Sequence, residues 1–436
     1  PAIEGTADSG SIINLFIDGN SSGISTRADV NGDFSINAPL QLDGTYVFAV
    51  SSSDPLGNSS EISNSVSITI DATAPGKPSI ITTTSLTNDA TPTIEGIAEA
   101  GSTVELFNGD VSLGTTTADE TTGAYTITPA ELSDGDYSLT VTATDAAGNI
   151  SAASDALSMT VDATAPAQPA ITTTITLTPD ATPTIEGTAE AGSTVTLLSS
   201  GVAIGTTTAN GDGQFSITTS TLADSNYVLT VTATDAAGNI SAASDALSIT
   251  VDATAPGKPS IITTTSLTND ATPTIEGIAE AGSTVELFNG DVSLGTTTAD
   301  GTTGAYSITP AELSDGAYSL TVTATDAAGN VSDASDALSI TIDATAPTQP
   351  AITTTTTLTT NATPTIEGTA EAGSTVTLLS GGVAIGTTTA NGDGQFSITT
   401  STLADSNYVL TVTATDAAGN ISAASSALNL TVDTTA

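Results

Sequence analysis

The chain has 436 residues, no Cys, His or Trp, and a formal charge of -45 from 48 acidic and three basic residues. This charge argues against nucleic acid and anionic membranes as partners, since both are negatively charged themselves. Without His or Cys, the commonest general base, the thiol nucleophile and the usual zinc ligands are missing, so we expect no enzyme. No apolar run approaches the roughly 18 residues of a membrane span, and direct membrane insertion is not expected.

A recurring phrase, D-A-T-A-P, divides the chain into repeats. It begins at Asp71, Asp162, Asp252 and Asp343, and a variant, D-T-T-A, begins at Asp433. A spacing of about 90 residues indicates domains arranged in series. The predicted domains are 1–70, 71–161, 162–251, 252–342 and 343–433, and 434–436 begin the next linker.

The first copy begins at Pro1, the counterpart of Pro92, and is therefore expected to lack its first strand. No signal peptide is visible at Pro1, so we expect the sequence to be a piece of a longer protein. The remaining copies are of two alternating types. One type carries T-V-E-L-F-N-G-D-V-S-L-G (103–114 and 284–295), and the other carries T-V-T-L-L followed by N-G-D-G-Q-F (194–215 and 375–396).

Apolar and polar residues alternate within each copy, as in Tyr137-Ser-Leu-Thr-Val-Thr-Ala143, which indicates strands rather than helices. In the second copy the predicted strands are about 78–85, 92–98, 103–108, 111–118, 123–129, 136–144 and 155–161. Seven short strands in about 90 residues predict an immunoglobulin-like sandwich. The predicted fold is thus all-β, a linear array of seven-stranded β-sandwiches.

Two aromatic positions recur in every copy. One opens the penultimate strand, where it is expected to form a tyrosine corner with nearby backbone: Tyr46, Tyr137, Tyr227, Tyr318 and Tyr408. The other comes earlier and is predicted to anchor the core: Phe34, Tyr125, Phe215, Tyr306 and Phe396.

Carboxylates from three separate segments are predicted to meet where the chain enters each domain. They come from the linker, from the I-E-G end of the second strand and from the T-D-A-A-G-N end of the sixth strand. At about 5 Å such carboxylates would repel each other by roughly 1–3 kcal/mol per pair. A calcium ion, which takes six to eight oxygen ligands, would turn this repulsion into a net attraction. The predicted calcium ligands are Glu4, Asp54, Asp71, Glu95, Asp145, Asp162, Glu186, Asp235, Asp252, Glu276, Asp326, Asp343, Glu367 and Asp416.

Two further sets of residues are secondary ligand candidates. One lies four residues beyond the second-strand Glu: Asp8, Glu99, Glu190, Glu280 and Glu371. The other is the Asn of G-N, which suits a turn equally well: Asn58, Asn149, Asn239, Asn330 and Asn420. The alternative to calcium binding is that the acids are solvated loop residues that support turns.

The segments D-A-T-A-P, T-P-T-I-E-G-x-A-E-A-G-S-T-V and L-T-V-T-A-T-D-A-A-G-N resemble the bacterial Ig-like repeats of giant calcium-dependent surface adhesins, including biofilm-associated and RTX-type proteins. The resemblance covers 71–433 and, more loosely, the first copy. It implies a structural extender, stiffened by calcium at domain junctions, that projects a distal binding domain for adhesion or biofilm formation. It also implies an extracellular location on the bacterial surface, reached by type I secretion.

On this interpretation the partners are calcium ions and the neighbouring repeats, and the adhesive target is bound by a domain outside this sequence. Two alternatives stay open. The repeats themselves bind glycan, ice or another cell, or the chain is a filament subunit whose first copy takes a strand from another molecule.

Overall fold

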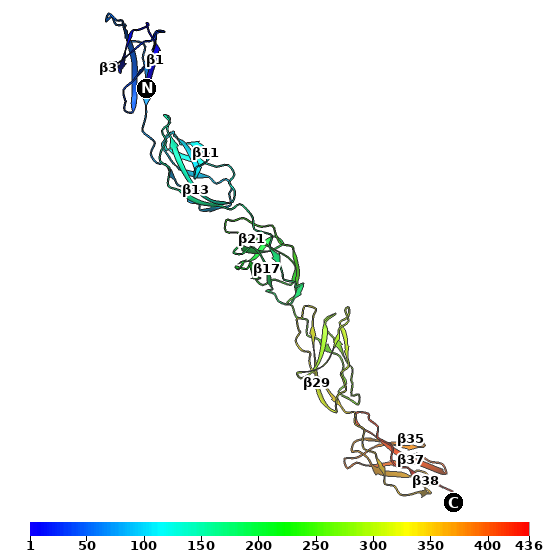
Figure 1. Ribbon diagram of the computed structural model, residues 1–436. Helices are drawn as coiled ribbons and strands as arrows, with labels where there is room; N and C mark the ends of the chain where they lie inside the picture. The colour runs from blue at the N-terminus through cyan, green and yellow to red at the C-terminus, as the bar shows by residue number, and fades with distance from the viewer. Residues whose placement is uncertain (436) are drawn as a thin grey trace. The chain divides into compact units, whose positions relative to one another are not determined.

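In a computed structural model, which describes residues 1–435, the chain forms five β-sandwich domains in series, coloured in chain order in Figure 1. The all-β, immunoglobulin-like prediction is confirmed. Residue 436, the last of the predicted 434–436 linker, lies outside the described residues. Among residues 1–435 no helix is long and apolar enough to cross a membrane. We refer to each domain by its predicted range.

The 71–161 domain illustrates the architecture. Its strands are β7 (Ser79–Ile80), β8 (Leu86–Thr87), β9 (Ile94–Ile97), β10 (Thr103–Asn108), β11 (Val111–Thr117), β12 (Ala124–Ile127), β13 (Gly135–Thr144) and β14 (Leu157–Val161). One sheet has the order β12-β9-β7 and the other has the order β11-β10-β13-β14-β8. All pairs are antiparallel except β8 with β14, which are parallel.

The prediction of a single first strand at 78–85 is wrong, because this segment pairs first with one sheet and then with the other. β7 pairs with β9, and then the main-chain N–H groups of Ile81 and Thr82 both point to Glu95 O, at 2.8 and 3.4 Å. The Thr82 hydroxyl accepts the Glu95 N–H at 2.8 Å, a hydrogen bond that a strand neighbour would otherwise accept. The chain then leaves this sheet and joins the other one as β8, so the first segment holds both sheets.

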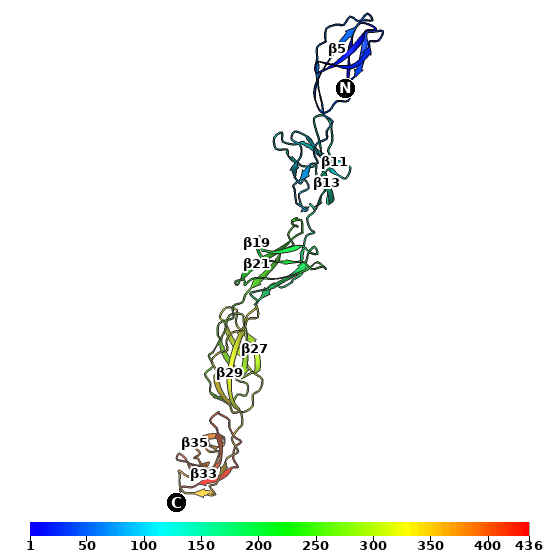
Figure 2. The ribbon, with the colours of Figure 1, turned by 90° about the vertical axis from the view of Figure 1, so that its left-hand side faces the viewer.

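The other three complete domains repeat this pattern. In 162–251 the strands are β15 (Ala170–Ile171), β16 (Leu177–Thr178), β17 (Thr184–Thr188), β18 (Thr194–Ser199), β19 (Val202–Thr208), β20 (Gln214–Thr218), β21 (Ser225–Thr234) and β22 (Leu247–Val251). In 252–342 they are β23 (Ser260–Ile261), β24 (Leu267–Thr268), β25 (Ile275–Ile278), β26 (Thr284–Asn289), β27 (Val292–Thr298), β28 (Ala305–Ile308), β29 (Gly316–Thr325) and β30 (Leu338–Ile342). In 343–433 they are β31 (Ala351–Ile352), β32 (Leu358–Thr359), β33 (Thr365–Thr369), β34 (Thr375–Ser380), β35 (Val383–Thr389), β36 (Gln395–Thr399), β37 (Ser406–Thr415) and β38 (Leu428–Val432). Figure 2 shows the turned view, in which β27 and β29 mark the five-stranded sheet of 252–342.

The first domain has fewer strands. They are β1 (Ala2–Thr6), β2 (Ile12–Ile17), β3 (Asn20–Arg27), β4 (Asp33–Asn37), β5 (Gly44–Ser53) and β6 (Val66–Ile70). β1 pairs only with β4, and the second sheet has the order β3-β2-β5-β6. No counterpart of β7 or β8 is present among residues 1–70.

The period-two pattern places one residue in two in the core between the sheets. In 71–161 the side chains of Ile94, Val104, Leu106, Leu139 and Val141 are completely buried. Burying each such side chain stabilises the fold by about 1.5–3 kcal/mol. The second aromatic of each copy is also buried, as predicted.

The tyrosine corners are confirmed in the four complete domains. The Tyr137 hydroxyl donates to Ser133 O at 2.7 Å, four residues earlier in the chain. Tyr227, Tyr318 and Tyr408 bind the corresponding carbonyls at 2.9, 2.9 and 3.0 Å. In the first domain Tyr46 packs against Phe48 with ring centroids 6.3 Å apart. These hydrogen bonds fix the turn that leads into the long strand β13 and its counterparts.

Candidate functional site

In every domain a polar loop follows the long strand β13 or its counterpart. Its sequence is D-A-A-G-N-x-S-x-A-S-x in the four complete domains and D-P-L-G-N-S-S-E-I-S-N in the first. We call it the junction loop; its copies are 54–64, 145–155, 235–245, 326–336 and 416–426. Asp145 begins the turn by accepting the N–H groups of Ala147 and Asn149 at 2.8 and 2.9 Å. Gly148 has a backbone φ of +94°, which residues other than glycine rarely adopt. The loop conformation is therefore specified locally.

The Asn of this loop holds the linker that precedes the domain. Asn149 Nδ2 donates to Asp145 Oδ2 at 2.7 Å and to the main-chain Asp71 O at 3.0 Å. Its counterparts hold Asp162 O, Asp252 O and Asp343 O at 2.6, 2.7 and 2.6 Å. The Asn149 amide is also the largest of the hydrogen-bond contributions that keep the pKa of Asp145 below its ordinary value. The first residue of each linker is thus attached to the domain that follows it.

Two buried serines fix the other half of the junction loop. Ser151 Oγ accepts the Ala143 N–H at 2.9 Å and donates to Ala152 O at 2.9 Å. Ser154 Oγ accepts the Val141 N–H at 3.1 Å and donates to Asp155 O at 2.8 Å. The serine hydroxyls therefore satisfy donors of β13 at positions where β14 does not pair with it. The same ladder is present in the three later domains.

A second Asp holds the linker from the domain before it. Asp134 Oδ1 accepts the Ala163 N–H at 2.7 Å, and Asp134 Oδ2 accepts the Thr164 hydroxyl. The Thr164 hydroxyl, followed by the Ala163 N–H, lowers the pKa of Asp134. The residues of this set are Asp43, Asp134, Asp224, Asp315 and Asp405.

The role of this second Asp was not predicted from the sequence. The available signal was positional, since an Asp lies 29 residues before the second linker residue in each copy. Asp224 and Asp405 precede Ser rather than Gly, so a glycine turn does not account for the set.

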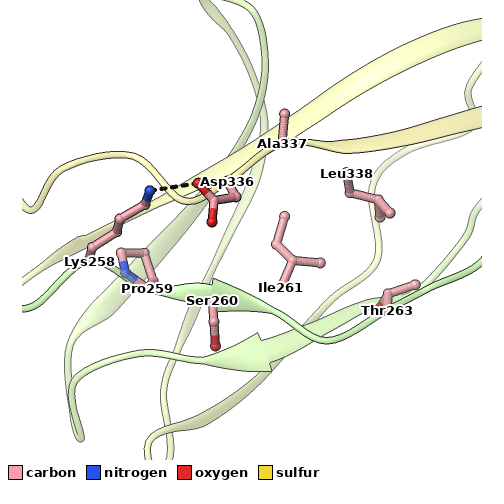
Figure 3. A pocket seen from close by; sticks show the side chains of 8 residues that line it. All are labelled: Lys258, Pro259, Ser260, Ile261, Thr263, Asp336, Ala337 and Leu338. Carbon is pink, nitrogen blue, oxygen red and sulfur yellow. Dashed lines mark hydrogen bonds and ion pairs between the residues drawn. The ribbon is translucent and has the colours of Figure 1, made fainter.

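The residue before the linker's last proline contacts the far end of the junction loop. Lys77 Nζ lies 2.7 Å from Asp155 Oδ1, and Lys258 Nζ lies 2.7 Å from Asp336 Oδ1. Figure 3 shows the second ion pair across one end of a shallow groove, with Ile261 and Leu338 further along it. In the other two complete domains a Gln replaces the Lys and donates to Ala243 O or Ala424 O, at 2.6 and 2.5 Å. Both Asp carboxylates are 99% exposed, so each ion pair adds little stability.

The structure brings together part of each predicted carboxylate trio. Asp71, through its main-chain oxygen, and Asp145, through its carboxylate, meet at Asn149. Glu95 lies within β9, its side chain is exposed, and its main-chain groups bind Thr82 and Ile81. Glu186, Glu276 and Glu367 occupy the same strand position, and in the first domain Glu4 Oε1 accepts the Ser35 hydroxyl at 3.4 Å. Among residues 1–435 no group of three or more Asp or Glu side chains is close enough to hold a metal ion.

The oxygens at Asn149 nevertheless suit a hard cation. A carboxylate oxygen and a carbonyl oxygen both point at the Asn149 amide group, and rotating this amide by half a turn would present a third oxygen to the same region. Calcium takes ligands of these three kinds together with water. The residues that fit are Asp145, Asn149 and the main chain of Asp71, whereas Glu95 is not in contact with them.

Comparisons with known proteins place these features in a family. The family described as Bacterial Ig-like domain matches residues 1–72, 79–163, 170–253, 260–344 and 347–434. Exoglucanase B of Cellulomonas fimi is 35% identical over 297 residues, which are 63% of this chain and 26% of the exoglucanase. Chitinase A1 of Niallia circulans is 38% identical over 129 residues, which are 27% of this chain and 18% of the chitinase. The chain therefore spans about a quarter or less of these two relatives.

A solved structure described as "Biofilm associated protein - BSP domain" is 14% identical, with a TM-score of 0.18, and covers 79% of this chain and 92% of that one. This likeness is too slight to support an argument. Tandem domains of the matched family occur in surface proteins and in glycoside hydrolases, and they are typical of extracellular proteins. The chain belongs to the bacterial Ig-like domain family and carries five tandem copies of the domain.

Proposed function

We propose that the five domains are a non-catalytic spacer that holds a binding domain away from the bacterial surface, as the stalk of an adhesin. The observation that carries this proposal is the attachment of each linker from both sides. In the linker after 71–161, Ala163 and Thr164 are bonded to Asp134 of the preceding domain, and Asp162 O is bonded to Asn239 of the following domain. The same contacts recur after each of the first four domains.

The physical effect is to remove freedom from a segment that would otherwise bend. Without contacts, each linker residue has two free backbone dihedrals, and only the Pro has one of them fixed. Hydrogen bonds to Ala163 N, to the Thr164 hydroxyl and to Asp162 O restrain three consecutive residues. A spacer made this way keeps its reach with no dedicated binding face, which agrees with the close similarity of its copies.

We further propose that calcium strengthens each junction. Asp71, Asp145 and Asn149 supply oxygens of the kinds that calcium prefers, and the 48 acidic residues of the whole chain attract the ion. When bound, the ion would supply electrostatic neutralisation between linker and loop. Secretion by the type I route would then deliver a chain with looser junctions from a calcium-poor cell interior to a calcium-rich exterior.

A second setting is favoured by the curated relatives. The similarity to an exoglucanase and a chitinase suits a spacer between domains of an extracellular enzyme that acts on polysaccharide. The residues that hold the linkers would have the same mechanical role in both settings. Binding of the chain to cellulose and to chitin would separate a spacer from repeats that grip glycan themselves, because a spacer is expected to bind neither.

Calcium titration of the full chain by calorimetry, followed by small-angle scattering with and without chelator, tests the proposal. The expected result is binding at about one ion per linker and a longer maximum dimension with calcium. A variant with the four junction-loop Asn residues changed to Asp separates the contribution of calcium from that of the amide hydrogen bonds. It keeps an oxygen ligand at each junction but loses the amide donor to the linker carbonyl. The substitutions are Asn149→Asp, Asn239→Asp, Asn330→Asp and Asn420→Asp. If the wild-type chain binds no calcium at millimolar concentration, the calcium proposal is wrong while the hydrogen-bonded spacer stands.

A further inference from the structure

The two alternating repeat types differ at one buried aromatic position next to the first strand. We call 71–161 and 252–342 the Tyr-type domains, with Tyr125 and Tyr306, and 162–251 and 343–433 the Phe-type domains, with Phe215 and Phe396. All four rings are 3–5% exposed. The Tyr125 hydroxyl donates to Ser79 O at 2.9 Å, and the Tyr306 hydroxyl donates to Ser260 O at 2.9 Å. A phenylalanine ring has no such donor.

This hydrogen bond acts on a strand with few others. β7 is two residues long and pairs only with β9, through Ser79 and Ile80. Beyond it, Ile81 and Thr82 share the carbonyl of Glu95 as their acceptor. The hydroxyl of Tyr125 is therefore a large addition to the contacts that keep this segment on its sheet.

The surrounding packing leaves little space around this contact. A Cβ added at Gly96 would lie 2.0 Å from Ser79 O and 2.2 Å from the Tyr125 hydroxyl oxygen. In the Phe-type domain 162–251, a Cβ at Gly187 would lie 2.1 Å from Ala170 O and 2.4 Å from Phe215 Cζ. The ring thus approaches the same strand carbonyl in both types, and only the hydroxyl is missing from the second type.

In both types a side chain of the first segment also contacts the junction loop, but the residues that make this contact differ. In the Tyr-type domains Lys77 binds Asp155 and Lys258 binds Asp336, the second of which Figure 3 shows. In the Phe-type domains Gln168 and Gln349 bind carbonyls of the junction loop instead. The tyrosine hydroxyl differs from this contact in that it binds a carbonyl of the strand itself, Ser79 O in β7 and Ser260 O in β23.

The position of this strand gives the difference a mechanical consequence. A pull along the chain reaches each domain through its two linkers and acts directly on its two terminal segments, one of which carries β7 and β8 or their counterparts. Detaching about ten residues of this segment would add roughly 30 Å of extended chain while the remaining strands stay folded.

We propose that the first strand is a latch that opens more readily in the Phe-type domains than in the Tyr-type domains, so that alternate domains release slack first under tension. The mechanical role rests on the proposed spacer function, whereas the difference in opening does not. Loss of one hydrogen bond of this kind is expected to change the opening equilibrium about fivefold, which is about 1 kcal/mol at 1.4 kcal/mol per tenfold.

Hydrogen exchange of the full chain, without force, tests the difference. The reporting amides are those that bind the central strand's Glu: Ile81, Thr82, Ile262 and Thr263 in the Tyr type, and Thr172, Thr173, Thr353 and Thr354 in the Phe type. After correction for intrinsic rates, the Phe-type amides are expected to exchange about fivefold faster. Tyr125→Phe with Tyr306→Phe should remove the difference, and Phe215→Tyr with Phe396→Tyr should slow the Phe-type amides about fivefold.

Amides of β10 and β13 in the same spectra report the stability of the whole domain and should change less than the latch amides. Equal protection of the two types, or no response of Ile81 and Thr82 to Tyr125→Phe, would overturn the proposal. A latch difference confirmed without force, together with a chain that proves flexible at its linkers, would leave the latch standing and remove its mechanical role.

Discussion

Removing one hydroxyl of the serine ladder should destabilise a single domain measurably. Ser151→Ala leaves the Ala143 N–H without an acceptor in a position where Ala143 is completely buried. A buried donor left unpaired costs about 1–3 kcal/mol, and a domain of about 90 residues loses about 4–8 °C in Tm per kcal/mol. We therefore expect the melting transition of the 71–161 domain to move down by roughly 4–24 °C.

Scanning calorimetry of the full chain measures this shift, because the destabilised domain melts apart from the other four. Ser158→Ala is the matched control, since Ser158 is an exposed serine of β14 in the same domain. Ser154→Ala should act like Ser151→Ala through the Val141 N–H, and the double variant is expected to fall short of the sum because both serines hold one loop. A shift for Ser151→Ala no larger than that for Ser158→Ala would refute the reasoning.

Three further outcomes follow from individual groups. Thr219 Oγ1 is buried without a hydrogen-bond partner, so Thr219→Val should raise the Tm of the 162–251 domain by about 4–8 °C in calorimetry, and a lower Tm would count against it. Burial raises the pKa of Tyr125 and of Tyr306 to about 12, so the stability tied to the protonated hydroxyls is complete below pH 10 and is lost as the pH rises towards 12. The Tyr-type domains should therefore lose more stability than the Phe-type domains over this range, which calorimetry at stepwise higher pH would show. The pKa of Asp134 is lowered by the Thr164 hydroxyl and the Ala163 N–H, so its hold on the linker is complete above the ordinary Asp pKa and is lost as the pH falls through the lowered value. NMR titration of the Ala163 amide should show this loss. The same Ala163 amide in the Asp134→Asn variant is the control, because that variant has no carboxyl group to titrate at this position.

The sequence predicted most of the fold because the core is built by simple alternation. Val104 and Leu106 point inward and their neighbours do not, which is all that a period of two requires. The tyrosine corner was also predictable, since it depends on one residue and a nearby carbonyl. The first strand was predicted wrongly because Thr82 satisfies the Glu95 N–H with its side chain, and a Thr in an alternating run gives no sign of that choice.

The candidate site was predicted less completely. The linker and the junction loop do meet, as the carboxylate argument expected, but the contact is made by the Asn149 amide and by main-chain oxygen. A sequence shows charged side chains readily and main-chain acceptors not at all. Asp134 was missed for the same reason, since its partners are the Ala163 N–H and a hydroxyl rather than a charged group.

The central claim is that hydrogen bonds from both neighbouring domains restrain each linker, and the width of an interdomain distance distribution tests it most directly. The chain contains no Cys, so Ser158→Cys and Ser216→Cys, both exposed, place one spin label in each domain flanking the Asp162 linker. Pulsed electron paramagnetic resonance in chelator should give a narrow distribution for this parent and a clearly broader one after Asp134→Ala with Asn239→Ala. Equal widths for the parent and the double variant would contradict the claim.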